Sequence, residues 1–300
     1  MRHPGRWVGI GIIGVLLAMF AHLLVTNDAF QWSFMVDNMF SEPIREGART
    51  TIVLTVLSMI LGVLLGIVLA VMRLSPNKVL SWTAWVYVWI FRSVPRLVLL
   101  VLAGNLGIIF ANGQIEFGLP FDRQLLDLFG VEGDARIFGL DSREVLSGFS
   151  AALIGLVLSE AAYMAEIVRA GILSVDSGQS EAALALGMNR PLTLRRIVLP
   201  QAMRVILPPT GNETIAMLKD TALVVAVPVS NELFFQLQAV GSRTFQVFPV
   251  LVAACLWYIA LTSVLLVGQH FLEKRFSRGF GRRQQDLPVQ VPAGGMGGAA

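Results

Sequence analysis

Six long apolar runs, separated by polar segments, are the main pattern in the chain. They occupy residues 7–25, 49–72, 82–110, 147–172, 203–227 and 248–271. A helix needs about 20 apolar residues to cross the hydrocarbon core of a bilayer, and each run meets that length. The pattern therefore predicts an all-α membrane protein with six membrane-spanning helices.

The first run follows Arg2 and Arg6, as the apolar part of a signal peptide would. It is longer than the roughly 7–15 residues typical of such a peptide, and no small-residue cleavage site follows it. We therefore expect a retained transmembrane helix.

The polar segments divide the chain into regions. We expect residues 1–26 to hold the N-terminal end and the first helix, 27–48 an external connector, 49–272 the main helical core, and 273–300 a basic and then disordered tail. Residues 112–144 carry seven acids and three arginines, and we expect an external loop there. A short external helix is expected within residues 228–247.

The composition agrees with this class. The chain is 55% hydrophobic and 14% charged, with a mean hydropathy of +0.69, and a soluble domain rarely carries so few charges. The net charge of +3 is therefore not a sign of a nucleic-acid partner. With both termini in the cytoplasm, and with Arg49, Arg169 and Arg204 at the span ends counted with the adjoining segments, 14 of the 23 Lys and Arg are cytoplasmic, 6 are outside and 3 lie within spans. The positive-inside rule favours this orientation.

Residues that carry chemistry are sparse. The lone Cys255 excludes a disulfide within the chain, and the three histidines lack the spacing of metal ligands. No lysine follows a glycine, so the chain has no phosphate-binding loop of its own. We find no arrangement of nucleophile and base at a membrane surface. The sequence therefore predicts neither an enzyme nor a bound metal or cofactor.

A polar stretch at residues 177–200 interrupts the apolar background. Ser177 or Ser180 can cap a short helix, and Glu181 falls in its first turn, where the helix dipole favours an acid. Gly187 supplies a left-handed stop. The stretch therefore begins with a helix of about two turns, which is too short to be stable without neighbours.

A second short helix is expected to follow, with Pro191 in its first turn and Pro200 at its end. Arg190, Arg195 and Arg196 make one side of the stretch basic. Spacing alone leaves two interpretations open, a loop lying on anionic lipid and a docking surface for another protein.

Within this stretch, Glu181-Ala182-Ala183, Gly187 and the run Ile197-Val198-Leu199-Pro200 match the EAA-G-I-LP loop of ABC importer permeases. From about residue 45 to 275 the chain resembles the permeases of polar amino-acid ABC importers, the histidine/glutamine/glutamate group. The other strings that carry the resemblance are AYMAEIVRAGILSV at 162–175, LPPTGNETIAMLKDTALV at 207–224 and VSNEL at 229–233.

The resemblance implies a core of five transmembrane helices in a bacterial plasma membrane, to which the first helix is an addition. It also implies three partners: a separate ATP-binding subunit, a second permease that is a sister or an identical chain, and an extracytoplasmic solute-binding protein. The residues expected to couple to the ATPase are Glu181, Ala182, Ala183, Gly187, Arg190, Arg195, Arg196, Ile197 and Pro200.

The chain departs from the family pattern at several positions. Ser93 and Val94 stand where Gly and Thr are usual, Arg96 stands where Leu is expected, and Ala222 stands where Ser is usual. These departures leave the substrate and the partners open, but not the class.

Polar side chains inside the spans are candidates for a substrate path, because an ionised group at the bilayer centre costs about 2.5–3.5 kcal/mol and needs partners. The set is Asn212, Glu213, Lys219, Asp220, Glu160, Tyr163 and Arg92. We expect the prolines at 208 and 209, with Gly211, to bend or break their helix. An amino-acid zwitterion would need one cationic and one anionic partner from this set.

Two alternatives stay open for these groups. Lys219 and Asp220 could belong to an interhelical ion pair that only locks the bundle. A stand-alone ion-coupled transporter could use Glu160, Glu213 and Asp220 as a proton relay, although that reading leaves residues 177–200 unexplained. Glu166 and Arg169 lie nearer the cytoplasmic end, so we expect them to order the 177–200 stretch.

Overall fold

The computed structural model describes residues 4–109, 113–118, 126, 136–146, 148–227 and 229–276. The helices are α1 (Pro4–Thr26), α2 (Trp32–Met39), α3 (Glu42–Arg73), α4 (Lys78–Ser93), α5 (Arg96–Gly104), α7 (Ser142–Val145), α8 (Gly148–Leu173), α9 (Ser177–Ala185), α10 (Arg190–Thr193), α11 (Leu199–Asp220), α12 (Leu233–Thr244) and α13 (Val247–Phe276). Short 3₁₀ segments are η1 (Asp28–Phe30), η2 (Leu106–Ile109) and η4 (Thr221–Ala226), and η3 (Leu194–Val198) is a π-helix. The strands are β1 (Gln114–Gly118) and β2 (Arg136–Asp141). The predicted all-α membrane class is confirmed.

The bundle is built around α8, which packs against α3, α4, α5 and α11. The backbones of α3 and α8 come close together at two glycines. A Cβ on Gly62 would lie 2.7 Å from Cγ of Glu160, and one on Gly66 would lie 2.6 Å from Cβ of Met164. Small residues one turn apart allow such an approach between membrane helices. The glycine pair therefore fixes how α3 and α8 pack.

Among the described residues, four single helices are long and apolar enough to cross a membrane: Gly5–Thr26, Glu42–Arg73, Gly148–Leu173 and Val247–Phe276. The predicted third span is not one straight helix, because α4 and α5 meet at an angle of 100°. Val94 is extended at the break, with φ −88° and ψ 130°. Pro95 follows it, and proline disfavours the helical conformation of the residue before it.

The fifth apolar run forms α11, which is more polar than the four spans and does not stand among them. Of the expected bend or break, the break does not occur, since α11 runs without interruption through Pro208 and Pro209. The hydroxyl of Thr210 donates to the carbonyl of Ile206 at 2.8 Å in the same turn. Threonine side chains of this kind help membrane helices to tolerate proline.

The polar segments predicted to be external contain more regular structure than expected. The connector 27–48 contains η1 and α2, and α3 already begins at Glu42. Strands β1 and β2 pair antiparallel within the predicted loop, with Gln114 opposite Asp141, an arrangement that the sequence analysis missed. The expected short helix is α12. Most of loop 112–144 and residues 277–300 of the tail lie outside the described residues.

A buried carboxylate holds α12 against the bundle. Glu232, which is fully buried, caps α12 by accepting hydrogen bonds from the backbone N–H groups of Phe234 and Phe235. It also accepts from the hydroxyls of Thr51 in α3 at 2.8 Å and Tyr258 in α13 at 2.9 Å. One side chain therefore joins three helices.

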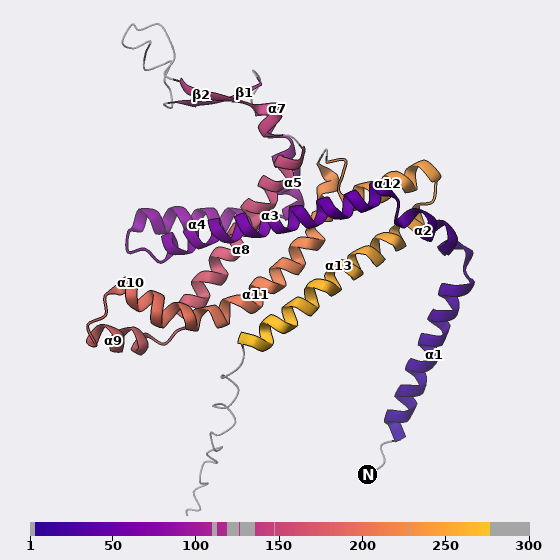
Figure 1. Ribbon diagram of the computed structural model, residues 1–300, viewed down its shortest axis with the longest axis horizontal. Coiled ribbons are helices and arrows are strands. Elements are labelled where there is room, and N and C mark those ends of the chain that lie inside the picture. Colours follow the sequence, from indigo (N-terminus) through magenta and orange to yellow (C-terminus); the bar gives the residue numbers. More distant parts are fainter. Residues whose placement is uncertain are drawn as a thin grey trace, which may run out of the picture.

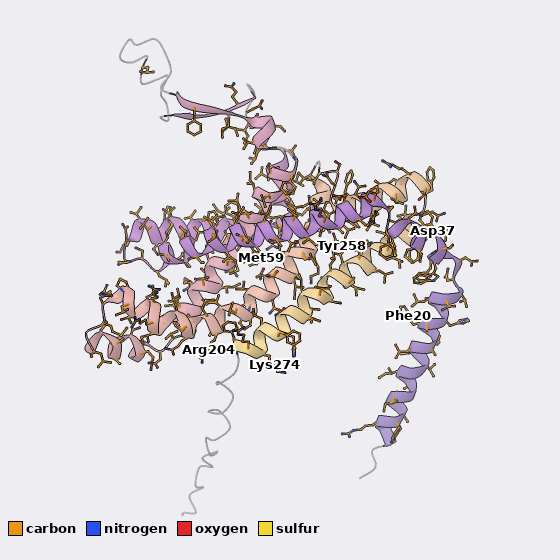
Figure 2. The ribbon with its side chains drawn as sticks, in the orientation of Figure 1. Phe20, Asp37, Met59, Arg204, Tyr258 and Lys274 are labelled. Atoms are coloured by element: carbon orange, nitrogen blue, oxygen red, sulfur yellow. The ribbon has the colours of Figure 1, made fainter. Side chains whose placement is uncertain are left out.

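Figure 1 shows α1 standing apart from the other helices, and no residue in its most apolar window is buried. Figure 2 places Phe20 on this separate helix and Met59 inside the bundle. Helices α9 and α10 lie at one end of the bundle, and α2 and α12 at the other (Figure 1). The 177–200 stretch is therefore remote from the connector 27–48 (Figure 1).

Candidate functional site

A charge centre joins three helices. Arg96, the first residue of α5, forms an ion pair with Asp220, the last residue of α11. Its second terminal nitrogen lies 3.3 Å from Oε2 of Glu160 in α8, and its Nε donates to the Ser159 hydroxyl at 3.1 Å. One guanidinium thus uses its fork of donors on two carboxylates and a hydroxyl.

The three charged groups differ in exposure. The side chain of Glu160 is fully buried, that of Arg96 is 12% exposed, and that of Asp220 is 34% exposed. Oε1 of Glu160 has no hydrogen-bond partner among the described residues. A buried carboxylate with a free oxygen is costly unless a charge compensates it, so Arg96 is what makes Glu160 tolerable as an anion.

An aromatic ring lies beside this centre. The guanidinium carbons of Arg92 and Arg96 lie 5.4 Å and 5.3 Å from the ring centroid of Tyr163. Both distances are within the range of a cation–π contact. Tyr163 therefore presents its face to cations.

The predicted path residues separate into two groups. Glu213 lies two turns before Asp220 on α11 and interacts electrostatically with Arg96, Arg92 and Asp220. With Glu160 and Tyr163, these residues gather at the charge centre. Two predicted residues do not join them. Asn212 is exposed and accepts a hydrogen bond at 2.9 Å from Gln269 of α13, and Lys219 is exposed.

The partner of Asp220 is Arg96, and Lys219 takes part in no ion pair among the residues that the structure describes. The sequence analysis left Arg96 out of the site. A charge inside an apolar run, at a position where the family pattern has leucine, was the signal that could have identified it.

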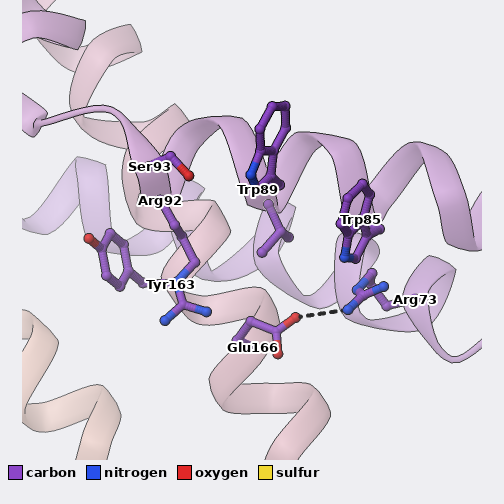
Figure 3. A pocket seen from close by; sticks show the side chains of 8 residues that line it. Arg73, Trp85, Trp89, Arg92, Ser93, Tyr163 and Glu166 are labelled. Carbon is purple, nitrogen blue, oxygen red and sulfur yellow. Dashed lines mark hydrogen bonds and ion pairs between the residues drawn. The ribbon is translucent and has the colours of Figure 1, made fainter.

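Tyr163 and Arg92 also line a cavity of about 390 Å³. Figure 3 shows Arg92, Tyr163 and Glu166 around it, with Trp85 and Trp89 along α4. The two indole rings are stacked, with centroids 6.1 Å apart. The cavity thus offers a cation, an anion and aromatic surface, and its size suits a small polar molecule.

Glu166 is held by two arginines. It lies 3.5 Å from a terminal nitrogen of Arg73 in α3 and 2.7 Å from one of Arg169. Both ion pairs join α8 to itself or to α3, so neither is a direct contact with the 177–200 stretch that Glu166 and Arg169 were expected to order.

The 177–200 stretch begins with α9, but its cap differs from the prediction. The side chain of Asp176, and not Ser177 or Ser180, accepts from the backbone N–H of Gly178 at 2.7 Å. Glu181 consequently lies in the middle of α9, and not in its first turn. An aspartate immediately before the serines was the better cap, since its carboxylate is a strong acceptor.

The predicted stop at Gly187 is confirmed. Its φ is +80°, in the left-handed region. Its N–H donates to the carbonyl of Leu184 at 2.9 Å, and the N–H of Met188 donates to that of Ala183 at 3.1 Å. This pair of bonds defines a Schellman motif, which favours glycine.

The second short helix begins as predicted, with Asn189 as cap and Pro191 in the first turn. It does not end at Pro200. Instead α10 passes through the π-helix η3 into α11, and Pro200 lies in the first turn of α11. Proline lacks an N–H and crowds the preceding turn. The turn before Pro200 is the wider π-helix η3, which leaves more room for the proline ring.

The surface of the stretch is both apolar and charged. Leu184 is 46% exposed and Leu186 is 85% exposed. Neither leucine was among the predicted coupling residues. Of those, Ala183 is buried and Ile197 is half-buried, and the rest are exposed: Glu181, Ala182, Gly187, Arg190, Arg195, Arg196 and Pro200. Beneath them a groove of about 610 Å³ separates α9 and α10 from the ends of α3 and α8.

Comparisons with known proteins agree with this geometry. Residues 62–278 match the family described as "Binding-protein-dependent transport system inner membrane component". The arginine transport system permease protein ArgU of Corynebacterium glutamicum is 47% identical over 280 residues, which are 93% of this chain and 82% of that protein. The L-cystine transport system permease protein TcyB of Bacillus subtilis is 34% identical over 256 residues, covering 85% of this chain and 95% of that protein.

Among solved structures, the crystal structure of an amino acid ABC transporter with histidines is similar, with a TM-score of 0.63 and 30% identity. The match covers 81% of this chain and 98% of that chain. The chain therefore belongs to the family of binding-protein-dependent transport system inner membrane components. It is a multi-pass permease subunit of an ABC importer and not an enzyme, since ATP is hydrolysed by a separate subunit. The ion-coupled alternative is not favoured.

Proposed function

We propose that this chain imports an amino acid, driven by a separate ATPase subunit that docks on residues 177–200. The observation that carries the proposal is the exposed apolar surface at Leu184 and Leu186, which a left-handed Gly187 holds at one end of the bundle. Exposed apolar side chains that lie together and are rimmed by polar residues are typical of a protein–protein interaction site.

The connection between the docking surface and the charge centre is a continuous helix. η3 leads directly into α11, whose far end carries Asp220. Its 22 residues span about 33 Å at 1.5 Å per residue. A displacement of the docking surface therefore moves Asp220 with it, and Asp220 is bound to Arg96 of α5. This linkage supports α11 as the coupling element.

The substrate is an amino acid, and the charge centre supports a basic one. Carboxylates at Glu160, Glu213 and Asp220 outnumber the arginines near them, Arg92 and Arg96. A surplus of acids favours a cationic ligand. ArgU, which is named as an arginine permease, supports the same class.

The remaining assignments follow from this role. Residues 1–26 add a helix to the permease core 49–272, with the connector 27–48 and the loop 112–144 on the outer side and the tail 273–300 in the cytoplasm with the N-terminus. The extracytoplasmic binding protein docks on the outer side. A second permease, a sister or an identical chain, completes the path. The exposed apolar faces of α3 and α13 support burial in lipid or against this second permease.

The test is uptake of labelled L-arginine into membrane vesicles that contain the chain and its co-expressed partners. Uptake should require ATP and the binding protein and should survive a protonophore. Uptake that ignores ATP but stops with the protonophore would support an ion-coupled carrier instead.

A further inference from the structure

The charge centre has more acceptors than Arg96 uses. Arg96 reaches only Oε2 of Glu160 and leaves the fully buried Oε1 without a partner among the described residues. Asp220 is one-third exposed, and Glu213 lies close enough to interact with it. Two carboxylates therefore pair with one guanidinium, and a third lies near them. An ion pair that only locked two helices together would not need this surplus of acceptors.

The contacts of Arg96 are those that any free guanidinium would make. Two carboxylates come from different helices, a serine hydroxyl accepts from Nε, and the ring of Tyr163 lies 5.3 Å from the guanidinium carbon. Charge-assisted bonds from a planar fork, together with an aromatic face, are the usual recognition of this group.

We propose that Glu160, Asp220 and Tyr163 form a site for the cationic side chain of the transported amino acid, which Arg96 occupies in this conformation as an internal competitor. The proposal rests on the proposed function, and it assigns to Arg96 the role of a specificity-determining residue. A cationic substrate binds when the Arg96 side chain leaves, and Arg96 returns when the substrate departs.

The position of Arg96 allows this exchange. Arg96 directly follows the 100° break at Val94 and Pro95, so α5 can turn relative to α4 about an extended residue. Asp220 lies at the end of α11, which is continuous with the docking surface. Movement of α11 relative to α5 separates Asp220 from Arg96 and opens the site.

The experiment measures equilibrium binding of L-arginine and of L-citrulline to the permease complex in lipid nanodiscs, without the binding protein. Citrulline has nearly the same shape but no side-chain charge. Arg96→Leu should bind L-arginine about tenfold more tightly, since one recovered charge-assisted hydrogen bond is sufficient for that change. Citrulline binding should not change. The control is Arg45→Leu, since Arg45 pairs only with the exposed Glu42.

An intact Arg96→Leu complex with unchanged or weaker arginine binding would overturn the proposal. Should that variant fail to fold, Glu160→Gln decides, because Arg96 then remains to fill the space. It should lower the preference for L-arginine over L-citrulline, and an unchanged preference would overturn the proposal. If the wild type binds neither amino acid and no ATPase co-purifies, the proposed function itself fails. If the wild type binds L-arginine and an ATPase co-purifies, the proposed function stands, and the variants then test the role of Arg96 alone.

Discussion

Arg96 and Asp220 lie 124 positions apart in the chain, and their ion pair joins the first turn of α5 to the last turn of α11. The pair lies at the end of α11 that is remote from the 177–200 stretch. Because Arg96 also holds Glu160 of α8, three helices meet at a single side chain. A change in the position of α11 therefore alters the contacts of Arg96 with Asp220, in the centre where the substrate is expected to pass.

Two neighbouring residues test whether this centre or the whole end of α11 matters. Asp220→Asn should lower uptake by about tenfold or more, the loss expected when a group that positions substrate is removed. Lys219→Met should leave uptake near the wild-type value, because Lys219 is exposed and outside the centre. Labelled arginine uptake, normalised to the amount of assembled complex, is the measurement. Equal losses in the two variants would contradict this placement of the path.

The left-handed conformation of Gly187 gives a matched pair of substitutions. Gly187→Asn should retain most coupling, since asparagine tolerates positive φ, whereas valine should distort the Schellman motif at a cost of about 1–2 kcal/mol. Nothing lies within 4 Å of a Cβ at this position, so the difference reports backbone conformation and not crowding. ATP hydrolysis stimulated by substrate is the readout. Similar values for both variants would show that the turn is not needed for coupling.

The approach of α3 to α8 predicts a steric effect at Gly66. A Cβ there would lie 2.6 Å from Cβ of Met164 and 3.1 Å from the carbonyl of Ala161. Gly66→Ala should therefore destabilise the protein by about 1–3 kcal/mol, as overpacking does. Gly14→Ala is the control, since a Cβ at Gly14 meets nothing within 4 Å. Thermal unfolding in detergent measures both, and equal midpoints would contradict the close packing.

Glu232 predicts a pH dependence of stability at the end of the bundle that carries α12. Burial raises the pKa of this carboxyl, while its hydrogen bonds from Thr51, Tyr258 and the α12 backbone oppose the shift. The folded protein then holds the proton more tightly than the unfolded chain. The free energy of unfolding should fall as pH rises from the unfolded pKa, about 4.3, through the folded value, and should be flat above it.

The measurement is the unfolding midpoint from about pH 4 to 7, for the wild type and for Glu232→Gln. The unfolding midpoint of Glu232→Gln should decrease less with rising pH than that of the wild type, because the variant has no carboxyl to titrate at this position. Glu46→Gln, at an exposed glutamate, controls for a change in overall charge. Parallel curves for the wild type and Glu232→Gln would show that Glu232 does not titrate as proposed.

The apolar pattern was sufficient to predict the membrane class and most spans, because burial in lipid depends on composition over a long window. It could not predict the break at Val94 and Pro95, since a run of apolar residues is equally compatible with one straight helix or two bent ones. Nor could it predict that α11 passes Pro208 and Pro209 unbroken, which depends on local hydrogen bonds and neighbouring helices.

Within the site, periodicity placed Glu213 and Asp220 on one face of α11, seven residues apart, and Asn212 and Lys219 on another. Packing decides which of these faces meets α5 and α8. The sequence alone therefore predicted all four residues as members of one substrate path. Gly187 was predictable from the turn alone, because its conformation is local. Arg96 was not, because its partners are supplied by two distant helices.

The central claim is that residues 177–200 couple this permease to a separate ATPase. The direct measurement is co-purification from detergent-solubilised native membranes, comparing the wild type with Glu181→Lys and with Glu46→Lys as a charge-reversed control at the opposite end. Glu181 is exposed in the middle of α9. We expect an ATP-binding subunit with the wild type and the control, and its loss from Glu181→Lys. An ATPase retained by Glu181→Lys, or absent from an intact wild-type preparation, would contradict the claim.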